Sequence, residues 1–489
     1  MAKLMVHLSL EMPGQYRKMQ NDQKMKGLFQ VPISIGVKNQ RIFKMGDNYI
    51  HPIQYFLYDG KVVGILPSMD KAFITKSSKD LPKSIVSKEK PIFHKSYKRK
   101  DRIKRVFVLT NACNLQCSYC FEGTHHVNKV MEPEMVENGI KQMFSEAKQL
   151  NKKLISISLF GGEPSMNWKA VETAIRTAKM LEQETGIRCY KAIVTNGVMD
   201  TAKVIYLAEN MDFIYFSFDG PRDLFLKQRK PKGGNDVYET IFNNAQEVYK
   251  KGTYLSFKIT VTKHTINSLK EIDDYFSYHF PTCGRLYQPC MVDHDDELYI
   301  SFGEFLEKYL ELKRYTLFSK NMSTSLYKNK PSDRFCNLMV RNVIYPDGNV
   351  LTCHRSNMCI PDDAVEREFK VGSCNKDGII TRLADRQKYM ESFVVDSIPE
   401  CKDCPWKYHC CGGCATIKLL SSNHDMFRKA DYCEDFLRYA WTELLSRLFE
   451  KEFEMIGSVP DRIESPKRDI IEDFKFFDEY VEKCIEIEE

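Results

Sequence analysis

Three cysteines lie close together in the chain, at Cys113, Cys117 and Cys120, in a C-x3-C-x2-C spacing. Thiolates are soft ligands that favour zinc or iron–sulfur clusters. A structural zinc site needs four protein ligands, and a disulfide framework uses cysteines in even numbers. Three thiols therefore predict a metal centre with one position left open to a further ligand.

A second group of cysteines lies towards the C-terminus. Cys336 and Cys353 flank a YPDG sequence, which predicts a hairpin that carries both thiols. A C-x2-C-x5-C-x3-C run and one later cysteine follow, at Cys401, Cys404, Cys410, Cys414 and Cys433. In a reducing compartment, the 17 cysteines of the chain indicate metal binding or redox work, not disulfides. This region predicts a second metal-bearing part, and a pair of structural zinc ribbons is the open alternative.

The composition is that of a globular chain with several domains. Its 489 residues correspond to about three domains at ~150 residues each. The net charge of +6, from 72 basic and 66 acidic residues, is too small to indicate nucleic-acid binding. No apolar run approaches the roughly 18 residues that span a bilayer, and the N-terminus becomes polar too soon for a secretory signal. We therefore expect a cytoplasmic protein without a membrane or nucleic-acid partner.

Six short apolar runs alternate with helical patterns in the middle of the chain. We predict strands over 104–110, 154–160, 190–197, 213–220, 254–262 and 285–292. The first helix between them has an apolar stripe at Val136, Ile140, Met143, Phe144 and Ala147. Repeated βα units predict an α/β fold with parallel strands, in the form of a partial (β/α)6 TIM-like barrel. The cysteine loop and the sequences GGEP, TNG and SFDG each follow a strand, at the end where such folds gather their chemistry.

The flanking parts of the chain differ in character from this middle part. We expect a β-rich N-terminal extension over residues 1–100, the barrel over 101–300, a linker over 301–335, a cysteine-rich domain over 336–435 and a helical segment over 436–489. Residues 94–105 carry seven Lys or Arg in twelve positions. Such a run is either a solvated linker or a basic patch that steers an acidic peptide.

The first cysteine group, with the aromatic Tyr119 before its last member, resembles the signature of the radical S-adenosylmethionine (SAM) enzymes. The resemblance implies that the three thiols bind a [4Fe–4S] cluster whose fourth iron holds SAM, and that reductive cleavage of SAM yields a 5′-deoxyadenosyl radical. In that interpretation the glycines of GGEP let the backbone approach SAM, Glu163 holds its amino group and Lys258 its carboxylate. The implied SAM contacts are Tyr119, Gly161, Gly162, Glu163, Pro164, Thr195, Asn196, Ser217, Asp219 and Lys258.

The second cysteine group, over residues 336–435, resembles the SPASM extension of radical SAM enzymes. The resemblance implies two auxiliary [4Fe–4S] clusters and three clusters in all. It assigns an outer cluster to Cys401, Cys404, Cys410 and Cys433, and an inner one to Cys336, Cys353 and Cys414. The inner set lacks a fourth cysteine upstream, so its cluster keeps an open iron or is completed by Cys290, Cys359 or Cys374. Cys411 is expected to point away, and ordinary thiols are expected at Cys189, Cys283 and Cys484.

SPASM enzymes mostly act on peptides or proteins, so the resemblance implies a peptide or protein substrate that contains cysteine. It also implies an electron donor such as flavodoxin or ferredoxin. We predict a crosslink, thioether or carbon–carbon, in a ribosomally made peptide, with residues 1–100 as a leader-binding extension. One alternative is an anaerobic sulfatase-maturating enzyme that oxidises Cys or Ser to formylglycine, with an acidic base among Asp293, Asp295 and Asp296. An alternative of another class is a zinc-bearing binding scaffold.

Overall fold

The fold is described from a computed structural model of the chain. It describes residues 44–45, 48–58, 61–69, 71–75, 84–88, 102–120, 129–290, 297–316, 321–324, 326, 332–334, 341–354, 368–420, 425–449, 456, 458, 460–463 and 481–486. The chain divides into two compact units. The larger unit comprises residues 99–325 and 336–392, and the smaller unit comprises residues 1–98, 326–335 and 393–489.

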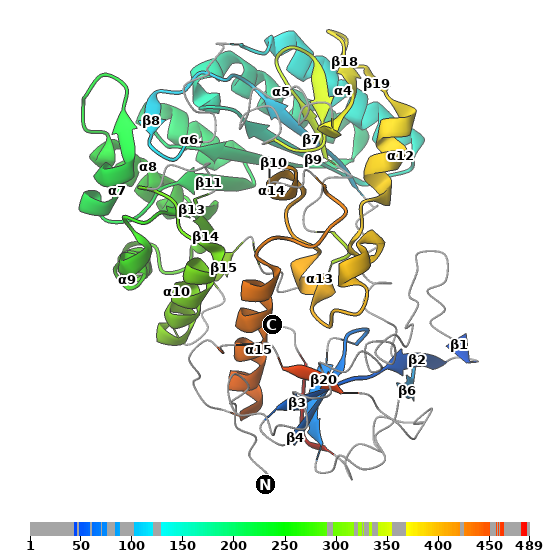
Figure 1. The fold of residues 1–489 in the computed structure, drawn as a ribbon. Helices are drawn as coiled ribbons and strands as arrows, with labels where there is room; N and C mark the ends of the chain where they lie inside the picture. The colour runs from blue at the N-terminus through cyan, green and yellow to red at the C-terminus, as the bar shows by residue number, and fades with distance from the viewer. Residues whose placement is uncertain are drawn as a thin grey trace. The chain divides into compact units, whose positions relative to one another are not determined.

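An eleven-stranded sheet forms the larger unit (Figure 1). The six predicted strands are confirmed, and they lie side by side in chain order and run parallel. They are β7 (Arg102–Val108), β9 (Leu154–Phe160), β10 (Arg188–Thr195), β11 (Phe213–Ser217), β13 (Tyr254–Val261) and β14 (Gly284–Pro289). Because the strands are parallel, their carboxyl ends meet at one edge, where the cysteine loop and the GGEP, TNG and SFDG sequences follow.

Further strands extend this sheet on both sides. The strand β15 (Met322–Thr324) lies parallel to β14, and β16 (Arg341–Ile344) lies parallel to β7. The YPDG sequence turns β16 into antiparallel β17 (Asn349–Leu351), which confirms the predicted hairpin. The sheet ends with β18 (Lys370–Cys374) and β19 (Ile380–Arg382).

Helices connect the parallel strands and bury their apolar stripes. In α4 the predicted stripe from Val136 to Ala147 is buried, so the helical period was read correctly. These helices are α4 (Pro133–Gln149), α5 (Trp168–Thr185), α6 (Thr201–Asn210), α7 (Arg222–Gln228), α8 (Tyr238–Lys250), α9 (Leu269–His279) and α10 (Phe302–Tyr315). The partly exposed α12 (Ala384–Ser392) follows β19 instead. This alternation of strand and helix is the predicted α/β architecture.

The end of the basic run has a different role from either one predicted for it. Arg105 on β7 is only 1% exposed. Its guanidinium donates to the carbonyl of Gly139 at 2.6 Å and pairs with Glu146, both on α4. The last residue of the run is therefore an anchor between a strand and a helix, not part of a solvated linker. Residues 94–101 lie outside the described part of the chain.

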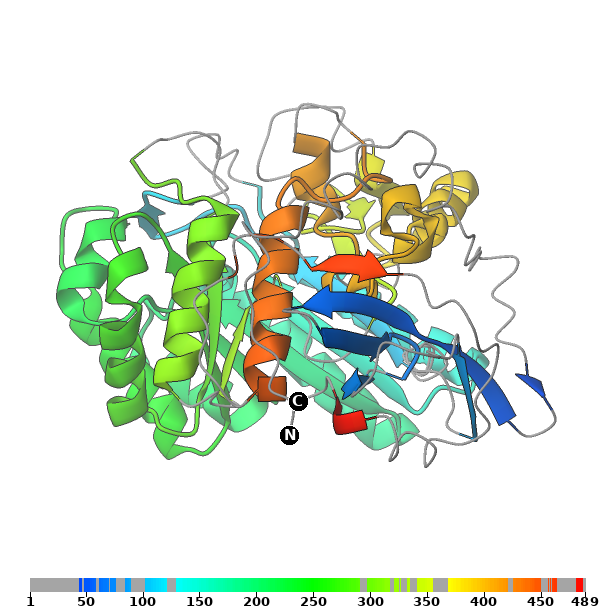
Figure 2. The ribbon, with the colours of Figure 1, turned by 60° about the horizontal axis from the view of Figure 1, so that its bottom comes forward.

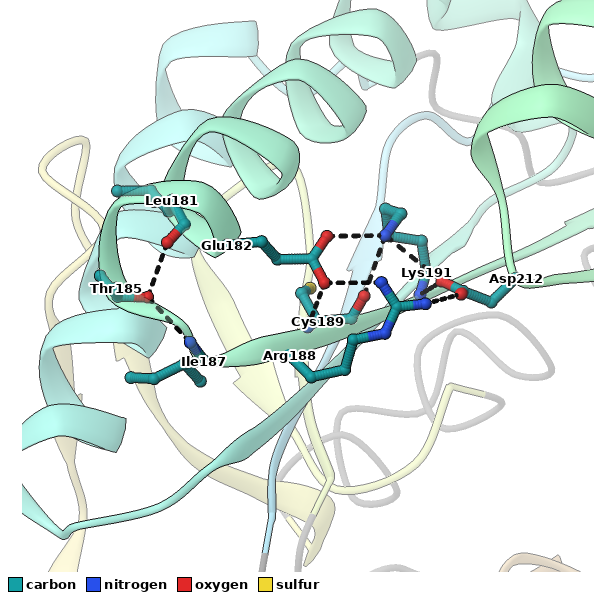
Figure 3. A network of polar contacts seen from close by, with 8 residues as sticks. All are labelled: Leu181, Glu182, Thr185, Ile187, Arg188, Cys189, Lys191 and Asp212. Atoms are coloured by element: carbon teal, nitrogen blue, oxygen red, sulfur yellow. Dashed lines mark hydrogen bonds and ion pairs between the residues drawn. The ribbon is translucent and has the colours of Figure 1, made fainter.

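A network of charged groups lies at the amino end of β10 (Figure 3). Lys191 is 3% exposed, and its ammonium lies 3.0 Å from Glu182 of α5 and 3.3 Å from Asp212. Arg188 also pairs with both carboxylates. Since the motif-bearing loops follow the opposite, carboxyl ends of the strands, this network stabilises the sheet away from the chemistry.

The smaller unit contains a five-stranded sheet that draws on both ends of the chain. Its core strands are β3 (Gln54–Tyr58), β4 (Lys61–Leu66) and β5 (Lys71–Thr75). The YDG sequence between β3 and β4 predicts a hairpin turn, and the pairing of Tyr58 with Lys61 confirms it. A second sheet holds β1 (Lys44–Met45), β2 (Asn48–Pro52) and β6 (Ser84–Ser87), so the N-terminal part is β-rich as predicted.

The C-terminal segment 436–489 differs from the helical segment that we expected. Its first part is helical, in α15 (Cys433–Phe449), but β20 (Asp461–Ile463) and β21 (Val481–Glu486) are strands. They pair antiparallel with β3 and β5 at the two edges of the five-stranded sheet. This pairing with strands about 400 residues away satisfies the backbone hydrogen-bonding groups of β20 and β21. No local sequence pattern predicts such a distant partner.

Two buried tryptophans connect this sheet with the cysteine-rich part of the same unit, in which α15 lies beside the strands of the sheet (Figure 2). The ring of Phe56 on β3 meets Trp441 of α15 at 4.7 Å between centroids, and Trp441 meets Trp406 at 5.9 Å. Trp406 precedes the short helix α13 (Lys407–Cys410), which is followed by α14 (Ala415–Leu420). The cysteine-rich part thus has an apolar core in addition to any metal it binds. In the described ranges, no helix combines the length and apolarity needed to cross a membrane.

Candidate active site

The first three cysteines converge in the loop that follows β7. All three are partly buried. The pKa of the Cys113 thiol is raised to about 12, chiefly by burial, and the charges of Cys117 and Cys120 contribute smaller parts of this rise. The amide of Cys120 donates to the carbonyl of Cys117 at 3.1 Å in a tight turn. The thiols are therefore close enough to feel one another's charge, as ligands of one centre must be.

A short two-stranded sheet fixes this loop to the segment after α7. The strand β8 (Leu115–Cys117) pairs antiparallel with β12 (Arg229–Pro231), and Cys117 lies opposite Arg229. The amide of Ser118 donates to the carbonyl of Gln228 at 2.9 Å, and the hydroxyl donates to the same oxygen at 3.2 Å. The cysteine loop is thus held along its length by backbone bonds.

Asp219 of the SFDG sequence lies fully buried beside this loop. Its Oδ2 accepts from the Tyr119 hydroxyl at 2.6 Å and from Arg229 Nε at 2.7 Å. Its Oδ1 accepts from Arg229 Nη2 at 3.2 Å and from the Thr260 amide at 3.0 Å. An ionised carboxylate has about four acceptor positions, and these four donors fill those of Asp219, which we had assigned as a contact of SAM. It holds Tyr119 and Arg229 instead.

Arg229 is a site residue that sequence reasoning missed. Its Nη1 lies 3.8 Å from Cys117 Sγ, and its guanidinium lies 5.2 Å from the centre of the Tyr119 ring. Burial raises the pKa of the Cys117 thiol to about 11, and the guanidinium opposes that rise. A single arginine at the end of a short helix has no spacing signature, so nothing in the sequence marked it.

The glycines of GGEP bring the end of β9 against the start of the cysteine loop. A Cβ on Gly161, whose φ is +155°, would lie 2.4 Å from the Thr110 carbonyl oxygen, and one on Gly162 would lie 2.5 Å from that of Ala112. The Gly162 amide donates to the Thr110 carbonyl at 2.9 Å. The close approach that these glycines permit is therefore to the loop itself, whereas we had assigned it to SAM.

Glu163 connects the ends of β9 and β10. It is fully buried, and its Oε1 accepts from the Ser165 amide and the Thr195 hydroxyl, both at 2.9 Å. Its Oε2 accepts from the Asn196 amide at 2.7 Å. Burial raises the pKa of Glu163, and these hydrogen bonds oppose the rise. Pro164 begins a 3-10 turn, η2 (Pro164–Asn167), directly after this carboxylate.

Asn196 of the TNG sequence reaches the cysteine loop directly. Its Nδ2 donates to Asn114 Oδ1 at 2.8 Å and lies 3.7 Å from Cys113 Sγ. The Leu115 amide donates to the same sulfur at 3.4 Å. Donors to a thiolate stabilise its negative charge and tune any cluster that it binds. Three converging thiols with N–H donors on two of them fit a [4Fe–4S] cluster.

Ser217 and Lys258 lie farther along this edge of the sheet. They are register partners on β11 and β13, and both side chains are half-buried. Their assigned contacts with SAM stay predictions.

Four cysteines of the smaller unit also lie close together, and they are the set predicted for the outer cluster. Burial raises the pKa of Cys404 to about 12, with additions from the charges of Cys401 and Cys433. Burial also raises the pKa of Cys410, to which Cys404, Cys433 and Cys401 each contribute. Cys433 begins α15, and a helix N-terminus favours a negatively charged group.

The neighbours of this set agree with its expected composition. Cys411 has a left-handed backbone (φ +55°), and its thiol lies 3.1 Å from the Ser332 carbonyl and 3.2 Å from that of Tyr408. Lys418 is fully buried, and burial lowers its pKa to about 8, while the charges of Cys401, Cys410 and Cys414 raise it. A cation therefore lies near the expected thiolates.

The inner cluster stays a prediction. Cys336 and Cys359 lie outside the described residues, as do Asp293, Asp295 and Asp296. Cys353 and Cys414 belong to different units. Of the candidates for a fourth ligand, Cys374 lies near Arg105 and its amide donates to the Gly348 carbonyl at 2.6 Å, and Cys290 is buried after β14. Cys189 and Cys283 are buried thiols, as predicted.

Comparisons with known proteins agree with the site. Residues 107–276 match the model of the Radical SAM superfamily. The cysteine-type anaerobic sulfatase-maturating enzyme of Clostridium perfringens (strain ATCC 13124) is 25% identical over 369 residues, which cover 69% of this chain and 95% of that protein. The radical SAM cyclopropyl synthase TigE of Paramaledivibacter caminithermalis is 24% identical over 382 residues, 72% of this chain and 75% of that protein.

Among solved structures, "Native anSMEcpe with bound AdoMet and Kp18Cys peptide" superimposes with a TM-score of 0.57 at 18% identity, over 71% of this chain and 99% of that one. This likeness shows a shared fold. The matched residues 107–276 include the three converging thiols, the GGEP and TNG segments and the buried Asp219. Residues 107–276 therefore carry a radical SAM domain, and the chain is an enzyme, not a zinc-bearing binding scaffold.

Proposed function

We propose that the enzyme modifies a peptide or protein and that it installs a crosslink, thioether or carbon–carbon, in a ribosomally made peptide. The observation that carries the proposal is the convergence of Cys113, Cys117 and Cys120 at the carboxyl edge of the parallel sheet. A [4Fe–4S] cluster held by these thiols would supply the electron that cleaves SAM, so that a hydrogen atom could be abstracted from the substrate.

The residues of the chain hold the loop in place for that chemistry. Glu163 ties the GGEP and TNG segments together, and Asn196 donates towards Cys113. Asp219 fixes Tyr119 against the loop. Such fixed geometry matters because a reactive radical must meet one C–H bond and little else. Half-buried Ser217 and Lys258 are the groups that we assign to SAM.

A peptide substrate is supported by the relatives and by the second cysteine group. One solved structure of similar fold holds a cysteine-containing peptide and AdoMet, as its name states. The close thiols of Cys401, Cys404, Cys410 and Cys433 support an outer auxiliary cluster, which would accept or relay the electron that a crosslink leaves over. We assign the electron that starts the reaction to a donor such as flavodoxin or ferredoxin.

The second candidate is the oxidation of Cys or Ser to formylglycine. It is favoured by the name of the Clostridium perfringens relative, which is a sulfatase-maturating enzyme. The two candidates share the radical step and differ in what happens to the substrate carbon afterwards.

The experiment is an anaerobic reaction of the purified enzyme with SAM, dithionite and cysteine-containing peptides. We expect 5′-deoxyadenosine to form, and its formation to stop when Cys113, Cys117 and Cys120 are all changed to Ala. The control variant is Cys189→Ala, which removes a buried thiol at the opposite end of the sheet. SAM cleavage by the triple variant at the normal rate would contradict the assigned cluster ligands.

The peptide product separates the two candidates. A peptide that still lacks two hydrogens after reduction of any disulfide, keeps its sulfur and does not react with a hydrazide probe carries a thioether or carbon–carbon crosslink. A peptide that reacts with the hydrazide probe carries an aldehyde and supports formylglycine formation.

A further inference from the structure

We infer that Arg229, held by Asp219, is a positioning residue that makes the cluster bound at Cys117 easier to reduce. The inference rests on the cluster ligation in the proposed function, and it goes beyond it because neither residue is assigned to the cluster there. Reduction adds one electron, and so one negative charge, to the cluster, which lies among the three thiolates. A fixed positive charge beside one thiolate stabilises the reduced state.

The geometry directs the positive end of the Asp219–Arg229 pair towards the thiol. Asp219 receives Nε at 2.7 Å and Nη2 at 3.2 Å, whereas Nη1, which makes neither of these bonds, lies 3.8 Å from Cys117 Sγ. The side chain of Arg229 is 5% exposed and that of Asp219 is 0% exposed. Water therefore screens the pair little, and its field acts at close range on the sulfur.

The backbone keeps this distance fixed. Cys117 and Arg229 are opposite residues of β8 and β12, so a shift of the arginine would have to break the short sheet. The neighbouring Lys232 amide donates to the Asn114 carbonyl at 3.1 Å on the same side. The guanidinium is thus placed by three elements, β8, β12 and the end of β11, and does not depend on a flexible side chain alone.

Charge-changing variants of the pair test the inference, because they must move the reduction potential in opposite directions. Arg229→Met removes the cation and leaves Asp219 as an uncompensated anion, so the cluster becomes harder to reduce. Asp219→Asn removes the anion and leaves the cation, so the cluster becomes easier to reduce. The double variant removes both charges and should lie between the two single variants. Arg229→Lys keeps the positive charge but not the paired hydrogen bonds to Asp219. Its reduction potential should lie closer to that of the unchanged enzyme than the potential of Arg229→Met does.

The measurement is a redox titration of the anaerobic holoenzyme. The readout is the part of its EPR signal that changes when SAM is added. We expect Arg229→Met to lower the equilibrium constant for reduction at least tenfold, about 59 mV for one electron. The matched control is Lys191→Met, which removes an equally buried, ion-paired cation at the amino end of β10. It should leave the potential unchanged.

The outcomes separate this inference from the proposed function. Absence of a SAM-responsive signal in the unchanged enzyme would contradict the cluster ligation itself. If that signal is present, equal or same-direction shifts in Arg229→Met and Asp219→Asn overturn the inference, since a merely structural pair would damage the site alike from either side. If Arg229→Met fails to retain iron, Arg229→Lys and Asp219→Asn still decide, because an unchanged or lowered potential in Asp219→Asn refutes the proposed field.

Discussion

Replacing Glu163 with Gln tests whether this carboxylate is a structural brace as well as a SAM contact. The two side chains have nearly the same shape, so the change alters charge and hydrogen bonding and little else. Glu163 accepts from three donors, the amides of Ser165 and Asn196 and the hydroxyl of Thr195. A glutamine has one acceptor oxygen and a donating NH2 in place of the second oxygen.

The expected cost follows from these contacts. If the glutamine oxygen keeps the Ser165 and Thr195 donors, its NH2 faces the Asn196 amide, which then has no acceptor. If the side-chain amide is flipped, the Ser165 amide loses its partner, because only the Thr195 hydroxyl can rotate to accept. A buried donor without a partner costs about 1–3 kcal/mol. We expect the free energy of unfolding to fall by about this amount.

The assay is urea denaturation of the anaerobic holoenzyme, paired with a measurement of SAM affinity. At about 3 kcal/mol per molar urea, the loss corresponds to a midpoint lower by ~0.3–1 M. The control is Glu172→Gln, the same substitution on the exposed face of α5. If Glu163→Gln weakens SAM binding but unfolds at the same urea concentration as the control, the structural role is refuted and Glu163 is a ligand contact only.

Two further predictions concern the other groups described above. Cys404→Ala should lower the iron content by about four atoms per chain and reduce thermal stability, because thiolate ligation contributes folding free energy. The control variant Cys411→Ala should keep its iron, because the Cys411 thiol faces backbone carbonyls. Equal iron content in the two variants would contradict the outer ligand set. Lys191→Met should lower the free energy of unfolding by about 1–3 kcal/mol, because Glu182 and Asp212 lose a buried cation. Calorimetry checks it, and an unchanged melting temperature would count against the network's stabilising role.

The strands and the thiols were predictable because both leave local, periodic signals. Each of the six parallel strands is a short apolar run that ends in a turn sequence, and the stripe on α4 repeats at the helical period. Cysteine spacing is equally local, since a loop of eight residues holds Cys113 and Cys120 together whatever the rest of the chain does. The YPDG and YDG turns fixed two hairpins for the same reason.

Long-range pairing was not predictable from such signals. The strand β21 pairs with β5 across most of the length of the chain, and no turn or period marks that partner. Arg105 looked like one charge in a basic run, and only the fold reveals that Gly139 and Glu146 surround it. Arg229 is the corresponding case in the site, because its partners Cys117 and Asp219 come from two other segments.

The polar residues at the strand ends have structural roles that motif recognition did not predict. Glu163 and Asp219 were assigned to SAM, yet they accept three and four hydrogen bonds from the protein itself. A buried carboxylate is costly unless its acceptor positions are filled, so a loop that must present thiolates at a fixed spacing supplies the donors. At most one acceptor position of Glu163 is left for the amino group of SAM, and Asp219 has none. We therefore predict that the half-buried Ser217 and Lys258, register partners on β11 and β13, contribute to the remaining recognition of SAM on this side of the sheet.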